Sequence, residues 1–297
     1  MTYFTDNSQT IGKTPLVRLN RVTDGAKATV LAKIEGRNPA YSVKCRIGVA
    51  MINDAQEKGL LGPGKELVEP TIGNTGIALA MTAAMLGYKM VLVMPENQSI
   101  ERRQSMAAYG AELILTAASG GMEFARDYAL QLQKEGRGRL LDQFANPDNP
   151  RAHIETTGPE IWRDTDGQVT HFISAMGTTG TITGVSTYLK SMNPNIQIIG
   201  AQPEEGSQIP GIRKWAPEYL PKIYQGDKVD RIEYVSQADA EEMARRLAAE
   251  EGIFCGISAG GALVVALRIA RQVENATIVF IVCDRGDRYL STGVFPA

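Results

Sequence analysis

The chain has 297 residues, of which 43% are hydrophobic and 22% charged, a composition typical of a globular protein with a sizeable core. Its net charge of −2 gives no reason to expect a nucleic acid as partner, and without a long apolar run or a signal-peptide pattern in the first ten residues we expect a cytoplasmic protein with no membrane contact. Three scattered cysteines and two histidines are too few for a disulfide framework or for a metal site built on these residues.

The first half of the chain reads as strands that alternate with helices. β-Branched and apolar residues predict strands at 16–19, 28–34, 66–69, 90–94 and 112–115. Helix-forming stretches, several of them closed by a glycine, predict helices at 44–59, 77–86, 99–109 and 122–135. A short apolar run at 140–144 ends this half.

The second half continues the alternation. Strands are predicted at 169–174, 196–201 and 277–282. Four helices are predicted in this half. One begins at residue 158, one runs from the end of the loop at 177–181 to about residue 192, one spans 238–251, and one follows Gly261. A Pro- and Gly-rich segment at 203–226 has no periodicity and is predicted to be a long ordered loop. This regular alternation predicts an α/β fold with mainly parallel sheets.

Lys44 stands at the start of the first predicted helix, just after a turn. Asn38 and Pro39 break the preceding strand, and the hydroxyl of Ser42 can cap the helix. The positive end of the helix dipole disfavours a cation at this position, which lowers the cost of deprotonating the amine. The pattern therefore indicates a nucleophilic lysine, while these residues alone leave an ordinary exposed lysine as the alternative.

Three small-residue loops each precede a helix, where a parallel sheet presents its ligands. In the loop at 71–76, glycines allow a ligand to approach the backbone, and Thr71, Asn74 and Thr75 supply polar side chains suited to a small carboxylate. The last of the three loops along the chain places Ser258 beside Gly260 and Gly261. These two loops are equally compatible with plain capped turns.

The middle loop, at 177–181, combines two glycines and three threonines at a helix start. Such a loop forms a nest of amide and hydroxyl donors of the right size for a phosphate. It is not a P-loop, because no Gly-Lys-Ser/Thr follows, and no Gly-x-Gly-x-x-Gly opens the first βαβ unit. The sequence thus favours a site that binds the phosphate group of a ligand other than a nucleotide.

A lysine nucleophile, a phosphate loop, a carboxylate loop and a lone serine are together typical of a pyridoxal phosphate site. From residue 10 to its end the chain resembles the cysteine synthase (O-acetylserine sulfhydrylase) family of fold-type II pyridoxal phosphate enzymes. Segments 203–212 and 283–293 are most similar to the isoform of this family that also accepts thiosulfate. Segment 38–46 is closer to the lysine motif of the other isoform.

The resemblance implies two mainly parallel-sheet αβα domains of the tryptophan synthase β-like type. A smaller mobile domain, 38–147, would carry the carboxylate loop. A larger domain, formed by 1–37 and 148–297, would carry the phosphate loop and Ser258. The family also implies a homodimer that acts on small amino-acid and sulfur substrates.

The resemblance further implies a role for each candidate residue. Lys44 would form the internal aldimine with pyridoxal 5'-phosphate and serve as general base, Asn74 would bind the ring hydroxyl, and Ser258 would face the pyridine nitrogen. The phosphate would be held by Gly177, Thr178, Thr179, Gly180 and Thr181. The substrate carboxylate would be held by Thr71, Thr75 and Gln143, together with Ile72, which replaces the serine usual in the family and so changes the affinity for the amino acid.

The implied reaction is a β-replacement through an α-aminoacrylate intermediate, which forms L-cysteine or S-sulfocysteine from O-acetyl-L-serine and sulfide or thiosulfate. A neutral serine opposite the ring nitrogen suits expulsion of a β-substituent better than transamination. We expect Arg213, with the neighbouring Lys214, to attract an anionic second substrate and Cys283 to leave space beside the reacting carbon.

Three alternatives stay open at this point. A cysteine desulfhydrase, a lanthionine synthase or a cystathionine synthase would use the same chemistry on another β-substituted alanine. A catalytically silent regulatory homologue is disfavoured by the intact Lys44, Asn74 and Ser258. A nucleotide-dependent dehydrogenase is disfavoured by the missing glycine fingerprint.

Overall fold

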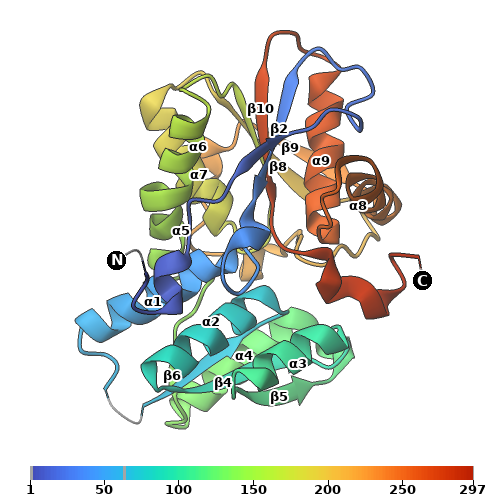
Figure 1. Cartoon of the computed structure of the whole chain (residues 1–297). Coiled ribbons are helices and arrows are strands. Elements are labelled where there is room, and N and C mark those ends of the chain that lie inside the picture. The colour runs from blue at the N-terminus through green and yellow to red at the C-terminus, as the bar shows by residue number, and fades with distance from the viewer. Residues whose placement is uncertain (1–2, 63–64, 297) are drawn as a thin grey trace.

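Two separate β-sheets organise the computed structural model, which describes residues 3–62 and 65–296 (Figure 1). The larger sheet has the order β1 (Leu16–Arg18), β2 (Thr29–Ile34), β10 (Thr277–Val282), β7 (His171–Ala175), β8 (Gln197–Pro203) and β9 (Arg231–Val235). The smaller has the order β5 (Glu112–Thr116), β4 (Lys89–Pro95), β3 (Glu66–Pro70) and β6 (Arg139–Leu140). Among these strands only β1 pairs antiparallel, with β2, so the predicted α/β fold with mainly parallel sheets is confirmed.

Helices cover both faces of each sheet and place each sheet in its own lobe. They are α1 (Lys44–Glu57), α2 (Asn74–Leu86), α3 (Ile100–Ala108), α4 (Gly121–Lys134), α5 (Asp148–Ala152), α6 (Gly158–Asp164), α7 (Gly180–Met192), α8 (Gln237–Glu251) and α9 (Ile257–Ala270). On the larger sheet α8 and α9 pack on one face and α6 and α7 on the other. On the smaller sheet α1, α2 and α3 share one face and α4 covers the other.

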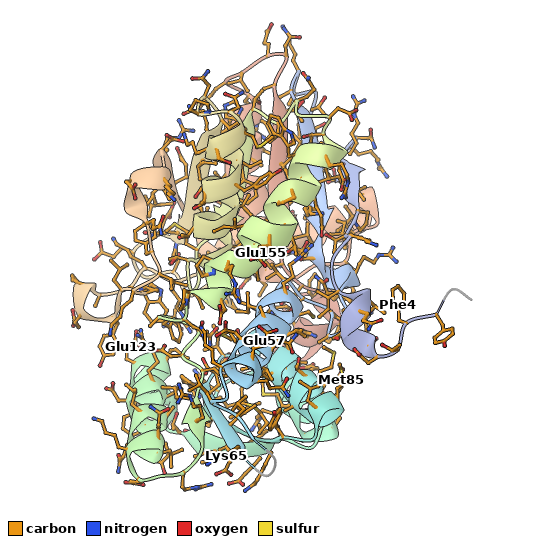
Figure 2. All side chains as sticks on the ribbon, turned by 90° about the vertical axis from the view of Figure 1, so that its left-hand side faces the viewer. Phe4, Glu57, Lys65, Met85, Glu123 and Glu155 are labelled. Atoms are coloured by element: carbon orange, nitrogen blue, oxygen red, sulfur yellow. The ribbon has the colours of Figure 1, made fainter. Side chains whose placement is uncertain are left out.

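The lobes meet at the level of α1. Figure 2 shows Glu57, at the end of α1, below Glu155 of the upper lobe, with Lys65 at the far end of the lower lobe. The ends of the predicted domains at residues 1–2 and 297, and residues 63–64 within the smaller one, lie outside the described residues. No helix in the described ranges is both long and apolar enough to cross a membrane.

Several elements differ from the sequence prediction. Strand β9 was not predicted, because it is an edge strand whose charged and apolar residues alternate. Helix α5 and the π-helical turn His153–Thr157, which lead without a break into α6, were also missed, since Pro150 suggests a loop. Helix α2 begins three residues earlier than predicted, at Asn74, and Ser258 lies inside the first turn of α9, not before it.

A buried ion cluster holds the start of α1 against the larger lobe. Arg46 donates from Nε to Glu35 Oε2 and from Nη1 to Glu160 Oε1, both at 2.8 Å, and Lys33 Nζ lies 2.7 Å from Glu160 Oε2. Burial alone would raise the pKa of Glu35, but the charge and hydrogen bonds of Arg46 lower it to about 2. The hydrogen bonds and charges of Arg46 and Lys33 likewise outweigh burial and lower the pKa of Glu160 to about 2. The cluster therefore ties α1 to β2 and α6 through charges that stay ionised.

We predict that Arg46→Met lowers the free energy of unfolding by about 3–5 kcal/mol at neutral pH, because it leaves buried carboxylates without their partner. The pKa of Glu35 and of Glu160 is lowered from an ordinary 4.5, so their contribution is complete above pH 4.5 and is lost as the pH falls toward 2. Urea unfolding should therefore show that the free energies of unfolding of parent and variant differ less at pH 3 than at pH 7. The exposed neighbour Arg37→Met serves as the control, and a gap of equal size at both pH values would contradict the assignment.

Candidate active site

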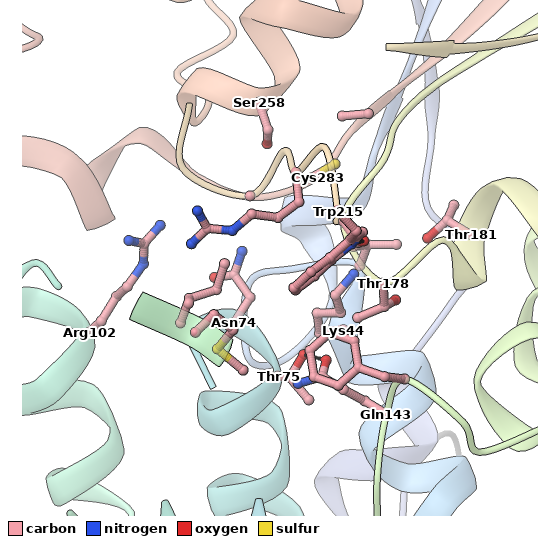
Figure 3. A pocket seen from close by; sticks show the side chains of 18 residues that line it. Lys44, Asn74, Thr75, Arg102, Gln143, Thr178, Thr181, Trp215, Ser258 and Cys283 are labelled. Carbon is pink, nitrogen blue, oxygen red and sulfur yellow. Dashed lines mark hydrogen bonds between the residues drawn. The ribbon is translucent and has the colours of Figure 1, made fainter. Parts of the chain in front are cut away.

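A pocket lies between the lobes, at the carboxyl ends of strands β3, β7, β8 and β10 (Figure 3). In a parallel sheet this is the edge where ligands bind. The structure brings these predicted site residues together in its lining: Lys44, Ile72, Asn74, Thr75, Gln143, Gly177, Thr178, Thr181, Arg213, Ser258 and Cys283. Figure 3 shows the Lys44 amine in the middle, with Ser258 above it, Arg102 to one side and Thr178 and Thr181 to the other.

Lys44 is the first residue of α1, as predicted, and its side chain enters the pocket. The helix N-cap is Val43, while the hydroxyl of Ser42 accepts the Lys44 backbone N–H at 3.2 Å. Burial lowers the pKa of Lys44, and the nearby Cys283 and Asp284 oppose this effect. The amine is therefore easier to deprotonate than a surface lysine, which suits a nucleophile or a base.

The loop that precedes α2 is held by its own threonines. The Thr71 hydroxyl accepts the backbone N–H groups of Gly73 and Gly76, each at 3.0 Å, and Thr71 is not among the pocket-lining residues. Gly73 has φ +146°, and a Cβ there would lie 2.3 Å from Arg102 Cδ, so no other residue fits. The loop thus presents its backbone and the side chains of Ile72 and Thr75 to the pocket, with Thr71 supporting it from behind.

Gln143 is fixed on every side. Its Oε1 accepts from the Thr75 hydroxyl at 2.7 Å, its Nε2 donates to the Pro70 carbonyl at 3.0 Å, and its backbone N–H donates to Glu69 Oε1 at 2.8 Å. Glu69, which accepts this N–H group, is itself buried, and its burial raises the pKa of its carboxyl group to about 8. The Gln143 carbonyl also accepts from Asn149 Nδ2, which donates to the Thr178 hydroxyl as well. Gln143 therefore links the loop before α2 to the loop before α7.

The loop before α7 fits a phosphate. Thr179 has φ 71° and precedes Gly180, the first residue of α7, so the backbone turns its amides toward the pocket. A Cβ at Gly180 would lie 1.8 Å from Asn149 Oδ1, which explains the glycine. Within the described ranges, the buried Thr179 Oγ1 and Asn149 Oδ1 have no hydrogen-bond partner. The free Thr179 hydroxyl and the backbone amides at the helix start are donors of the kind that a phosphate group requires, whereas Asn149 Oδ1 can only accept.

The remaining predicted residues lie around the opposite side of Lys44. Asn74 Nδ2 donates to Asp284 Oδ2 at 2.7 Å, and Asn74 Oδ1 accepts from Arg288 Nη1. Burial raises the pKa of Cys283 to about 11, even though a hydrogen bond with Ser258 lowers it. Cys283 is therefore a small neutral thiol beside the Ser258 hydroxyl.

Sequence reasoning missed Arg102, Met122 and Phe144, which also line the pocket. Arg102 lies on α3, the helix that follows β4, so its position after a parallel strand was the available signal. Arg213 reaches the pocket, whereas Lys214 points away, with Nζ 5.3 Å from the centre of the Tyr234 ring. The expectation that Lys214 helps Arg213 to attract an anion at the pocket is therefore wrong, because the Lys214 amine lies over the Tyr234 ring.

Aromatic side chains close one wall of the pocket. Trp215 Nε1 donates to the Gly177 carbonyl at 2.8 Å, and its ring meets Phe144 edge to face with centroids 5.4 Å apart. The long loop after β8 is thereby fastened to the phosphate loop. Phe144 and Trp215 thus form an apolar wall of the pocket that Lys44 also lines.

Comparisons with known proteins agree with this geometry. The family model described as "Pyridoxal-phosphate dependent enzyme" matches residues 7–284. The chain is 60% identical to "Cysteine synthase B" of Pseudomonas aeruginosa, over 96% of this chain and 95% of that one. It is 58% identical to "Cysteine synthase B" of Escherichia coli, over 97% and 95% of the two chains.

Two solved structures share the fold over nearly the whole chain. O-ureido-L-serine synthase superposes with a TM-score of 0.93 at 39% identity, covering 99% of this chain and 96% of that one. Cysteine synthase from Entamoeba histolytica superposes with a TM-score of 0.92 at 40% identity, covering 99% and 91%. The two-lobed arrangement is therefore shared with enzymes that bear different names.

Proposed function

Because the chain belongs to the family of pyridoxal-phosphate dependent enzymes, we propose that it is a cysteine synthase that replaces the acetate of O-acetyl-L-serine with sulfur. The observation that carries this proposal is the buried Lys44 amine, which faces the phosphate-sized loop at 177–181 across one pocket. The relatives named cysteine synthase supply the substrate class.

The residues that line the pocket, together with Thr179 and Gly180, which belong to the loop before α7 but are not among the lining residues, fit pyridoxal phosphate from end to end. Lys44 would hold the aldehyde carbon through Nζ, Asn74 the ring oxygen, and Ser258 the ring nitrogen. The phosphate would be held by Gly177, Thr178, Thr179, Gly180 and Thr181. Bound pyridoxal phosphate supplies an electron-withdrawing ring that eases loss of the α-proton and of the β-substituent of an amino acid.

Lys44 moves the proton in this reaction. Because burial lowers the pKa of Lys44, a larger share of the amine is neutral and able to accept the α-proton at Nζ. The charge of Asp284 opposes this effect and so helps Nζ to hold that proton while acetate leaves. The aromatic wall of Phe144 and Trp215 keeps bulk water from competing for the same site.

The carboxylate of the amino acid would lie against the loop before α2. Thr75 and Gln143 present polar groups there, Ile72 contributes a backbone amide and an apolar side chain, and Thr71 holds the loop in shape. Holding the carboxylate fixes the Cα–H bond in front of Lys44 Nζ.

The second substrate would be an anion. Arg102 and Arg213 both line the pocket, and the Nε atom of each is buried without a hydrogen-bond partner among the described residues. Burial lowers the pKa of Arg213, the charge of Glu123 opposes this effect and the charge of Arg102 adds to it, which indicates that the two cations lie near each other. Two guanidinium groups whose Nε donors are free suit a divalent anion, so we include thiosulfate, with S-sulfocysteine as its product, beside sulfide.

The proposal extends to the organisation of the protein. Residues 38–147 would form a smaller domain that closes on the larger one, supported by the separate sheet and core of the lower lobe. We also propose a homodimer, on the strength of the family resemblance. A cytoplasmic location is supported by three cysteines that are all free thiols.

We predict that Lys44→Ala abolishes cysteine formation and removes the linkage to the coenzyme that borohydride reduces. After reduction, mass spectrometry should find the coenzyme's mass on the parent and on the control Lys58→Ala, at the other end of α1, but not on the variant. A Lys44→Ala protein with full turnover would end the proposed mechanism.

We predict that Ile72→Ser tightens binding of β-substituted alanines, because a hydroxyl becomes available to the carboxylate. The expected gain is about 1 kcal/mol, or roughly fivefold in Kd, the net worth of one hydrogen bond. Spectral titration with O-acetylserine measures it, and Ile72→Val controls for the loss of side-chain volume. Unchanged or weaker binding of every amino acid tested would show that Ile72 serves another substrate.

We predict that Arg213→Ala lowers kcat/KM for thiosulfate at least tenfold while leaving sulfide less affected, since a charge-assisted contact contributes roughly 1.5–3 kcal/mol. Added salt should narrow the difference, because it screens the attraction. Lys214→Ala, whose charge points away from the pocket, is the matched control. Equal losses for both acceptors would show that Arg213 does not choose the sulfur donor.

A further inference from the structure

We propose that Asp284 and Arg288 are positioning residues, which fix the amide of Asn74 so that it offers an N–H group to the coenzyme's ring oxygen. This inference rests on the proposed function, in which Asn74 touches that oxygen. Asp284 and Arg288 belong to the segment after β10, from which Cys283 enters the pocket lining.

The three residues come from both lobes. Asn74 is the first residue of α2 in the lower lobe, whereas Asp284 and Arg288 follow β10 of the larger sheet. Asp284 Oδ2 accepts from Asn74 Nδ2 at 2.7 Å, and Arg288 Nη1 donates to Asn74 Oδ1. The amide is therefore held between an acidic group at its nitrogen and a basic group at its oxygen.

This arrangement permits a single orientation of the amide. A flipped Asn74 would place its NH₂ against the Arg288 guanidinium, which has only donors, and its carbonyl against the Asp284 carboxylate, which has only acceptors. Both contacts would then be repulsive. An Asn74 NH₂ group has two hydrogens, and Asp284 takes one of them, so the second hydrogen remains as a donor.

Asp284 is a buried carboxylate whose hydrogen bonds are incomplete. It is only 1% exposed, its Oδ2 also accepts from the Tyr289 hydroxyl at 2.6 Å, and its Oδ1 has no hydrogen-bond partner among the described residues. Among the described residues Asp284 forms no ion pair, although its charge acts on the nearby Lys44 amine. A buried carboxylate in this state is costly, so its retention calls for an explanation beyond packing.

Arg288 is equally constrained. It is 5% exposed, its Nη2 donates to the Ala40 carbonyl in the turn before Lys44, and its own carbonyl accepts from the Ser99 hydroxyl. The guanidinium thus spans from the Lys44 turn to Asn74. Its charge polarises the Asn74 amide so that the N–H groups become better donors, which suits a ring oxygen that carries negative charge.

The test is the absorption of the purified holoenzyme, measured as the ratio of the coenzyme's visible band to its near-ultraviolet band across pH. Asn74→Ala removes the N–H donor to the ring oxygen. We expect it to lower the ratio of the visible to the near-ultraviolet band roughly five- to tenfold, the effect of one net hydrogen bond. Asp284→Ala should change the ratio in the same direction, and the double variant should change it no further than Asn74→Ala alone. Asp284→Asn, which keeps an acceptor, should recover most of the parental ratio.

Asp287→Asn is the matched control, because it removes a carboxylate of the same segment that pairs with Arg285 at 3.1 Å. Thermal unfolding of each protein without coenzyme reports folding separately. If Asp284→Ala does not fold, Arg288→Met and Asp284→Asn carry the test, with a lowered ratio expected for Arg288→Met.

A parental ratio in Asp284→Ala beside a lowered ratio in Asn74→Ala would overturn the inference, as would additive changes in the double variant. An unchanged ratio in Asn74→Ala would overturn it by removing the donor role of Asn74. A parent that takes up no coenzyme would instead refute the proposed function.

Discussion

The buried guanidinium of Arg46 is the constraint on which the site depends. Its bonds to Glu35 and Glu160 fix the first turn of α1 against the larger lobe, two residues beyond Lys44. The Lys44 amine consequently enters the pocket at one place only, between the phosphate loop and Asn74. A lysine held this way loses solvent on folding, and that burial is the largest influence on its pKa.

The other groups reach Lys44 because both sheets end their parallel strands at the same boundary. The larger sheet contributes the loops after β7, β8 and β10, and the smaller sheet contributes the loop after β3. Polar contacts then join the lobes across the pocket, through Gln143 and Asn149 on one side and Asn74 and Asp284 on the other. The pocket is therefore lined by groups whose relative positions depend on how the lobes sit together.

The sequence was sufficient for the fold class and for most of the pocket, because both depend on local patterns. Gly177 and Thr178 stand after an apolar strand, Lys44 starts a helix after a turn, and each pattern is readable within a few residues. Features set by distant contacts were not readable. Lys214 points toward Tyr234 and Arg102 enters the pocket because of neighbours far along the chain. The Thr71 hydroxyl is instead engaged by the nearby Gly73 and Gly76, through a loop geometry that the residue types alone do not reveal. Edge strand β9 was missed because one exposed side weakens its apolar pattern.

The claim that Lys44 and its surroundings form a pyridoxal phosphate site for β-replacement is tested most directly by the absorption spectrum of the purified protein. We expect a visible band that shifts when O-acetyl-L-serine is added and returns when sulfide follows, with cysteine released. A protein without a visible band, or with a band that O-acetyl-L-serine leaves unchanged, would contradict the account.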